Sequence, residues 1–381
     1  MRPALTLSLS LFAAGLATTA STPLQAQRVM LPPAIEVRIP KPPSVLRGDG
    51  QRVLVYELHV TNLAAETLTL SRVEVLGDGS TVPLAAMEDS ALRGAITRPG
   101  VAIPPGERGK IAGGLRAVVF MWVGLANGVQ PPTRLHHRLT LRRSGADSGA
   151  VSIVDAGDVP VSSELVVIAA PLRGSVWLAA NGPSPTTGHR RAMIAVEGGP
   201  HIAQRFAIDY LKINAEGQSY VGDRLKNSSY MAYGNDALAV ADASVVAVKD
   251  GIPENVPGSR AVPITLETVG GNHVILDLGN GLYAFYAHLQ PGSIRVRLGD
   301  KVKTGQVLGL VGNSGNSTEP HLHFHISDAN SPLGSEGVPY VHQSLQVLGR
   351  CAGLISGCTS TQAVSHSQEM PMANQLIQFP K

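Results

Sequence analysis

Short apolar runs alternate with polar turns along most of the 381 residues. In the first half, runs such as VLVYELHVTN at 53–62 and LRAVVFMWVGL at 115–125 are rich in Val and Leu, and Gly, Pro and Asp separate such runs from one another. Short stretches of this composition, bounded by turn-forming residues, are typical of antiparallel strands. The pattern predicts an all-β fold that begins with a β-sandwich over residues 28–170.

The second half repeats this pattern of strands and turns. Residues 181–188, NGPSPTTG, have the composition of a loop, so we expect a linker over 171–188 and a second β domain over 189–347. Two stretches marked by Gly or Pro, 214–236 and 249–263, are expected to form long loops that could wall a groove.

The C-terminal residues 348–381 are polar and weakly patterned, and we expect this tail to be poorly ordered. The tail holds both cysteines of the chain, Cys351 and Cys358. Their spacing matches no cysteine-rich metal site, and an exported compartment would permit their oxidation. We therefore expect a disulfide between them, with free thiols as the alternative.

The N-terminus resembles a targeting segment rather than part of the fold. Arg2 is followed by a short apolar run and then by small residues before Gln27. This order predicts a secretory signal peptide over residues 1–26, with a membrane anchor as the alternative. No later stretch is apolar for long enough to span a bilayer, so the protein is expected to be exported, to the periplasm or outside the cell. The net charge of +3 is too weak to indicate a nucleic-acid partner, and the oligomeric state stays open.

The candidate chemistry lies near residue 320, where three histidines occupy alternate positions. Residues two apart in a strand face the same side and lie about 6.7 Å apart, so His321 and His323 can address one site while Leu322 and Phe324 pack behind them. His288 ends another predicted strand, YAFYAHL, in which alternation would place Tyr286 on the same face as His288. Taken alone, the pair of alternate histidines is not decisive, and His288 is an ordinary histidine at a strand end.

Three ordered segments together are more specific: YAHL at 286–289, GDKVKTGQVLGLVGNSG at 299–315 and EPHLHFH at 319–325. Over residues 189–345 the chain resembles the lysostaphin-type, or LytM-type, zinc metallopeptidases that hydrolyse cell walls. The resemblance implies a compact antiparallel β domain of the duplicated hybrid motif type. It also implies one zinc ion per chain, held by two histidines and one aspartate, and two further histidines in catalytic roles.

By position in these motifs, His323 corresponds to a metal ligand, and His321 and His288 correspond to the catalytic histidines. His325 has no role in the family and is interpreted as a strand residue. The family aspartate usually follows a histidine by four residues. Asp209, in QRFAIDYLKI, has the right apolar setting, but Arg205 stands four residues before it. The first histidine ligand must therefore come from elsewhere.

Two histidines are candidates for that ligand. If residues 201–209 formed one extended strand, His201 would lie about 26 Å from Asp209 and could not share a zinc ion with it. A tight turn just before His201 would instead build an antiparallel hairpin that aligns His189 with Asp209, at about 5 Å between Cβ atoms. We therefore predict His189, Asp209 and His323 as the metal ligands, whereas a bend before Asp209 would favour His201.

The leading hypothesis is an exported zinc metalloendopeptidase that hydrolyses peptide bonds of peptidoglycan cross-links or stems with a metal-activated water. Peptidoglycan peptides are then the expected partner. The alternative is a metal-free, degenerate module of the same fold that binds cell wall or regulates another hydrolase. The joint presence of four site residues favours the enzyme: Asp209, His288, His321 and His323.

A third hypothesis takes residues 299–311 as part of a lipoyl- or biotinyl-carrier-like domain. Such a domain needs a modifiable lysine at an exposed hairpin tip. Lys301 and Lys303 have no supporting motif around them, so this hypothesis is the weakest.

Overall fold

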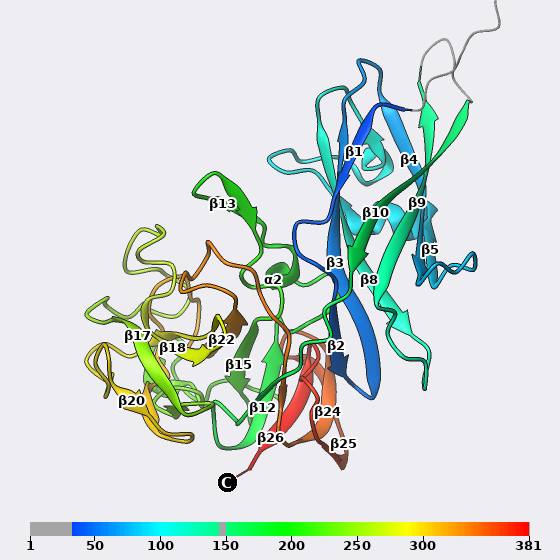
Figure 1. The fold of residues 1–381 in the computed structure, drawn as a ribbon. Coiled ribbons are helices and arrows are strands. Elements are labelled where there is room, and N and C mark those ends of the chain that lie inside the picture. Colours follow the sequence, from blue (N-terminus) through cyan, green and yellow to red (C-terminus); the bar gives the residue numbers. More distant parts are fainter. Residues whose placement is uncertain (1–32, 145–149, 381) are drawn as a thin grey trace, which may run out of the picture. The chain divides into compact units, whose positions relative to one another are not determined.

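The computed structural model describes residues 33–144 and 150–380 (Figure 1). The predicted signal peptide at 1–26 lies outside the described residues. Strands dominate the described part of the chain and all but one of their pairings between named strands are antiparallel, so the all-β fold class is confirmed. Its short helical segments are α1 (Asp89–Ala95), η1 (Pro105–Glu107), α2 (Gly188–Arg191) and η2 (Asn227–Ser229).

The N-terminal part is a sandwich of two five-stranded sheets. In the first sheet, β1 (Ile35–Arg38), β3 (Gln51–Asn62), β8 (Arg116–Leu125) and β6 (Ile96–Thr97) follow one another, and β2 (Ser44–Gly48) also pairs with β3. In the second sheet the order is β10 (Val151–Pro160), β9 (Arg134–Arg143), β4 (Leu68–Gly77) and β5 (Ala85–Glu88), and β7 (Lys110–Ile111) also pairs with β4. Leucines and valines of both sheets share one buried core, as the alternating pattern predicted.

Strand β3 is buried on both of its faces, which is unusual for a strand of a two-layer sandwich. Leu54 and Leu58 enter the sandwich core. On the opposite face Val53 and Val55 belong to a second buried cluster, which also contains Trp177 and Phe379 from the C-terminal half. The near-continuous apolar run of β3 thus reflects contacts with two different cores.

The C-terminal half is built on one ten-stranded antiparallel sheet. Its strand order is β20 (Lys301–Val302), β17 (Ala243–Lys249), β18 (Asn272–Gly279), β19 (Leu282–Leu289), β22 (Leu322–Ser327), β15 (Ile208–Lys212), β12 (Gly174–Ala180), β26 (Gln375–Phe379), β24 (Leu345–Gly353) and β25 (Ser356–His366). Three smaller pairs complete it: β11 (Val166–Ile168) with β23 (Tyr340–His342), β13 (Ile194–Val196) with β14 (Gly199–His201), and β16 (Asp236–Leu238) with β21 (Val307–Leu310).

The expectation about the connection between the two halves is wrong. The segment 171–188, expected to be a linker, contains β12, which lies between β15 and β26 and buries Trp177 completely. Its apolar residues need burial, and only the residues after Ala180 form the loop that the Pro and Gly content indicates. The boundaries of whole domains therefore stay a proposal.

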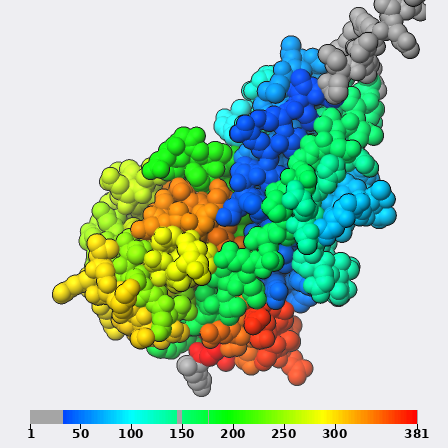
Figure 2. Space-filling view, viewed as in Figure 1, coloured from blue at the N-terminus to red at the C-terminus, as the bar shows by residue number. Residues whose placement is uncertain are grey.

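The C-terminal tail is not disordered, because it supplies three strands to the sheet. β26 pairs with both β12 and β24, so its backbone groups are satisfied, and Ile377 and Phe379 are fully buried. The exposed β25 hairpin explains the polar sequence, and Cys351 and Cys358 face each other across it and form a disulfide. In Figure 2 the red and orange surface of these strands adjoins blue residues of the N-terminal half. Among the described residues, no helix is long and apolar enough to cross a membrane.

Candidate metal and catalytic site

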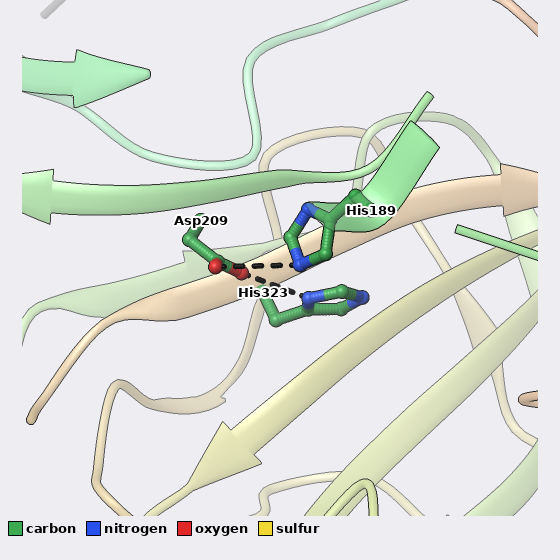
Figure 3. A group of neighbouring side chains, drawn as sticks. All are labelled: His189, Asp209 and His323. Carbon is green, nitrogen blue, oxygen red and sulfur yellow. Dashed lines mark hydrogen bonds and ion pairs between the residues drawn. The ribbon is translucent and has the colours of Figure 1, made fainter. Parts of the chain in front are cut away.

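Three side chains from separate elements meet at one point: His189 from α2, Asp209 from β15 and His323 from β22 (Figure 3). One potential ligand atom of each lies within 4.8 Å of the others. Asp209 and His323 are direct partners in the β15–β22 pairing, and His323 Nδ1 lies 2.8 Å from Asp209 Oδ1. His189 Nε2 lies 3.4 Å from the other carboxylate oxygen, Oδ2. The predicted combination of residues is therefore brought together.

The route by which His189 arrives differs from the predicted hairpin. β13 pairs with β14 so that Ile194 faces His201, and the pairing ends there. His189 lies before this hairpin, in the one-turn helix α2 that follows the loop after β12. The expected alignment across extended strands is wrong, because the chain turns at residues 202–207 rather than continuing as one strand into β15. His201 points elsewhere, with its Nδ1 3.4 Å from a carboxylate oxygen of Glu336.

Groups outside the cluster orient the His189 ring and the Asp209 carboxylate. His189 Nδ1 lies 3.3 Å from the carbonyl oxygen of Ala207, to which it can donate a hydrogen bond, and this leaves Nε2 unprotonated toward Asp209. Asn181 donates a hydrogen bond of 2.8 Å to Asp209 Oδ2. The carboxylate and the imidazole are thus held in place by groups that do not belong to the cluster itself.

His325, interpreted from sequence as a simple strand residue, contacts the site. Its Nδ1 lies 3.0 Å from His323 Nε2, and its side chain is fully buried. If His323 turns an unprotonated Nδ1 toward the cluster, its Nε2–H donates to His325 Nδ1, and His325 then carries its own proton on Nε2. Within the described part of the chain that Nε2 has no hydrogen-bond partner. The sequence signal was the alternation itself, because residues 323 and 325 must share a face.

His288 and His321 lie beside the cluster, with their ring centroids 4.9 Å apart. Each turns Nδ1 to a backbone carbonyl oxygen: His288 to Ser314 at 2.8 Å and His321 to Glu319 at 2.7 Å. In a neutral ring this arrangement leaves Nε2 as the acceptor. Both rings line a cavity of about 270 Å³, together with the three residues of the cluster.

His288 reaches the cavity through a bulge rather than by simple alternation. Tyr286 is buried in the core and its hydroxyl accepts a hydrogen bond from Val240 N–H, whereas His288 lines the cavity, so the two do not share a face as expected. The β18–β19 register shifts at this point, and His288 has a positive φ of 65°. A left-handed conformation in a non-glycine residue costs free energy, which is common where a side chain must be aimed at a functional site.

The charges around Asp209 keep it ionised. Burial raises the pKa of Asp209, but the neighbouring imidazoles of His189 and His321 outweigh burial and hold the pKa well below its usual range. Burial lowers the pKa of His288 well below its usual value, and His321 and His323 lower it further. Burial also lowers the pKa of His321, but the Asp209 carboxylate reverses this effect and the net shift is upward.

The donor set fits a divalent transition metal. Two imidazoles and one carboxylate, with a cavity beside them, match the three-protein-ligand arrangement that leaves one position for water or substrate at catalytic zinc sites. The hydrogen-bond partners of the potential ligands also fit a metal site, since each histidine of the cluster has its outer nitrogen near an acceptor.

Part of the chain matches a known family. Residues 230–334 match Peptidase family M23. Peptidoglycan DD-endopeptidase ShyA of Vibrio cholerae serotype O1 is 36% identical over 86 residues, which are 22% of this chain and 20% of that protein. Lysostaphin of Staphylococcus simulans is 30% identical over 95 residues, which are 24% of this chain and 18% of that protein.

Among solved structures, the catalytic domain of a mutant of the prophage-encoded M23 protein EnpA from Enterococcus faecalis is 24% identical, with a TM-score of 0.26, over 47% of this chain and 95% of that one. The sequence matches show that the chain contains a peptidase family M23 domain, which confirms the resemblance drawn from the three motifs. The matched segments span about a fifth of the length of these two curated relatives. Asp209 and His189 precede the residues that match the family.

Proposed function

We propose that this protein is an exported zinc metalloendopeptidase that hydrolyses peptide bonds in the cross-links or stems of peptidoglycan. The observation that carries this proposal is that the three potential metal ligands and two further histidines line one cavity. The substrate class is proposed by analogy with the relative ShyA, a peptidoglycan DD-endopeptidase. Export follows from the predicted signal peptide at 1–26.

In this proposal His189, Asp209 and His323 hold the zinc ion. When bound, zinc supplies a Lewis acid and makes a water nucleophilic near neutral pH. The carboxylate of Asp209 keeps part of the positive charge compensated, and Ala207 and His325 hold the two imidazoles in the tautomers that ligation requires.

His288 and His321 handle protons and developing charge. Each ring is fixed through Nδ1 by a backbone carbonyl, so Nε2 is the atom that works in the cavity. One Nε2 accepts a proton from the attacking water and later delivers it to the leaving amine, and the other, when protonated, donates a hydrogen bond to the oxyanion of the attacked peptide carbonyl. Because the rings lie side by side, a single tetrahedral centre can contact both.

The test is zinc content together with peptidoglycan digestion. We expect about one zinc ion per chain, release of soluble peptide-containing fragments from purified peptidoglycan, and loss of both in His189→Ala and His323→Ala. His201→Ala is the matched control and should keep both. A wild-type chain that takes up no zinc after reconstitution would overturn the peptidase proposal in favour of the metal-free module.

A further inference from the structure

The residue next to the proposed ligand His189 is anchored in the sandwich. Arg190 is 1% exposed, and a guanidinium buried so deeply requires partners for its charge and its donors. Arg190 Nη1 forms an ion pair with Glu57 of β3, and Nη2 donates to the carbonyl oxygens of Tyr56 at 2.8 Å and of Met121 at 3.3 Å. All three partners belong to adjacent strands of the first sandwich sheet, β3 and β8.

The Glu57 carboxylate also fixes the chain segment that orients the His189 ring. Arg205 donates to both oxygens of Glu57, from Nε at 3.1 Å and from Nη2 at 2.8 Å. Two residues further along lies Ala207, whose carbonyl oxygen orients the His189 ring. Glu57 therefore tethers the helix that carries the ligand and the segment that carries the acceptor for its ring.

The helix depends on contacts with the rest of the chain, including a hydrogen bond of 2.8 Å from Arg191 Nη2 to the carbonyl oxygen of Gly94. α2 contains four residues, far fewer than an independently stable helix needs, and it has no side-chain cap at its N-terminus. Its position is therefore set by tertiary contacts, and the Arg190 guanidinium provides buried and directional ones, with Phe120 at 5.0 Å below the guanidinium.

We propose that Glu57 of the N-terminal sandwich is a positioning residue for the metal ligand His189, so that the sandwich completes the metal site. This inference rests on the proposed zinc site. It also accounts for Arg205 at the place where the family usually has a histidine: the chain uses that position to bind Glu57 and takes its histidine ligand from α2 instead.

The charges of this group are balanced only while Glu57 is present. Glu57 and Glu336 face Arg190 and Arg205, and Arg205 Nη2 reaches Glu336 at 2.5 Å. Burial raises the pKa of Glu57, but the two guanidiniums outweigh it and lower the pKa to about 2. Burial lowers the pKa of Arg190 to about 10. Glu57 is therefore an anion at neutral pH, and its removal would leave Arg190 without a counter-charge.

The experiment compares zinc affinity in the full chain and in its Glu57→Gln variant, by competition with a chromogenic chelator. Glu74→Gln is the matched control, because Glu74 also forms an ion pair in the sandwich. Its partner is Arg72, and both residues lie in β4 of the second sheet. We expect Glu57→Gln to weaken zinc binding about 10-fold, the lower end of the range for groups hydrogen-bonded to metal ligands, because Glu57 acts through Arg190 and Arg205. Glu74→Gln should bind zinc as the wild type does.

The visible spectrum of the cobalt-substituted protein separates positioning from a general loss of stability. At saturating cobalt and at a temperature where circular dichroism shows the variants to be folded, Glu57→Gln should change the absorption bands and Glu74→Gln should not. Unchanged zinc affinity and an unchanged cobalt spectrum in Glu57→Gln would overturn the inference while leaving the peptidase proposal intact. Absence of zinc binding in the wild type would overturn the peptidase proposal itself.

A second variant keeps the test decisive if Glu57→Gln does not fold. Arg190→Lys retains the charge beside Glu57 but cannot also donate to the Tyr56 and Met121 carbonyls, because lysine lacks the planar fork. It should weaken zinc binding in the same direction and alter the cobalt spectrum. Wild-type affinity and spectrum in this variant would contradict the proposed tether.

Discussion

Asp209 and His323 face each other directly across β15 and β22, with Oδ1 and Nδ1 2.8 Å apart. Two strands far apart in sequence thus present a carboxylate and an imidazole as a fixed pair, and only the third ligand has to be supplied from outside this pairing. The position of His189 is therefore the variable on which the proposed zinc site depends.

Removing the metal should destabilise the protein. A ligand that binds only the folded chain adds about 2.7 kcal/mol at a hundredfold excess over its Kd. We expect dialysis against a chelator to lower the urea midpoint of the wild type, and added zinc to restore it. His323→Ala should show the same midpoint with and without chelator. Equal midpoints for the zinc-loaded and chelated wild type would contradict the site.

Substitution of the two proposed catalytic histidines should separate chemistry from metal binding. His288→Ala and His321→Ala should retain about one zinc ion per chain, because neither belongs to the ligand set, and should lose about 10²- to 10⁴-fold in the rate of peptide hydrolysis. His366→Ala, at the end of β25 and away from the cavity, is the control and should keep full activity. Full activity of both site variants would refute these roles.

Replacing His325 should weaken zinc binding although His325 is not a proposed ligand. In His325→Phe the acceptor for His323 Nε2–H is lost while most of the buried volume is kept, and we expect about 10-fold lower affinity in chelator competition. His273→Phe is the matched control. Both His273 and His325 lie against the Phe285 ring, but His273 has its Nδ1 near a backbone carbonyl oxygen and not near a proposed ligand. Equal zinc affinity of both variants would show that His325 is only a strand residue.

Acid should reveal the contribution of Glu57 to stability. Its pKa is about 2 in the folded protein, below its ordinary value of 4.5. A carboxylate with a lowered folded-state pKa stabilises the fold above its unfolded-state pKa, and this stabilisation is lost as the pH falls through the folded-state pKa. The shift corresponds to about 3 kcal/mol. The difference in unfolding free energy between wild type and Glu57→Gln should shrink between about pH 4.5 and 2 in urea titrations.

The disulfide should matter for stability and not for catalysis. Cys351 and Cys358 lie seven positions apart in sequence and close a short loop at the edge of the sheet, for which chain entropy predicts about 2 kcal/mol. Cys351→Ser together with Cys358→Ser should lower the unfolding free energy by about this amount and leave zinc content and peptide hydrolysis unchanged. A loss of zinc would indicate that the edge strands support the site.

Local sequence determined much of this protein. The pattern of short apolar runs and polar turns was enough to predict the all-β fold class, because strands are short and are bounded by turn-forming residues. The two-residue period of a strand put His321 and His323 on one face above buried Leu322 and Phe324, and apolar neighbours marked Asp209. These features depend on residues close together in the chain, so they can be recognised without the fold.

Tertiary structure decided the rest, because it depends on residues far apart in sequence. The tail became ordered only by pairing with β12, and His288 is aimed by a bulge that alternation does not predict. The predicted hairpin between His189 and Asp209 does not form, and His189 reaches Asp209 from α2, which its buried Arg190 anchors. The pairing of Arg190 with Glu57 joins residues 133 positions apart. The two charges attract each other strongly because they are buried, and burial without a partner would be costly, which no local pattern records.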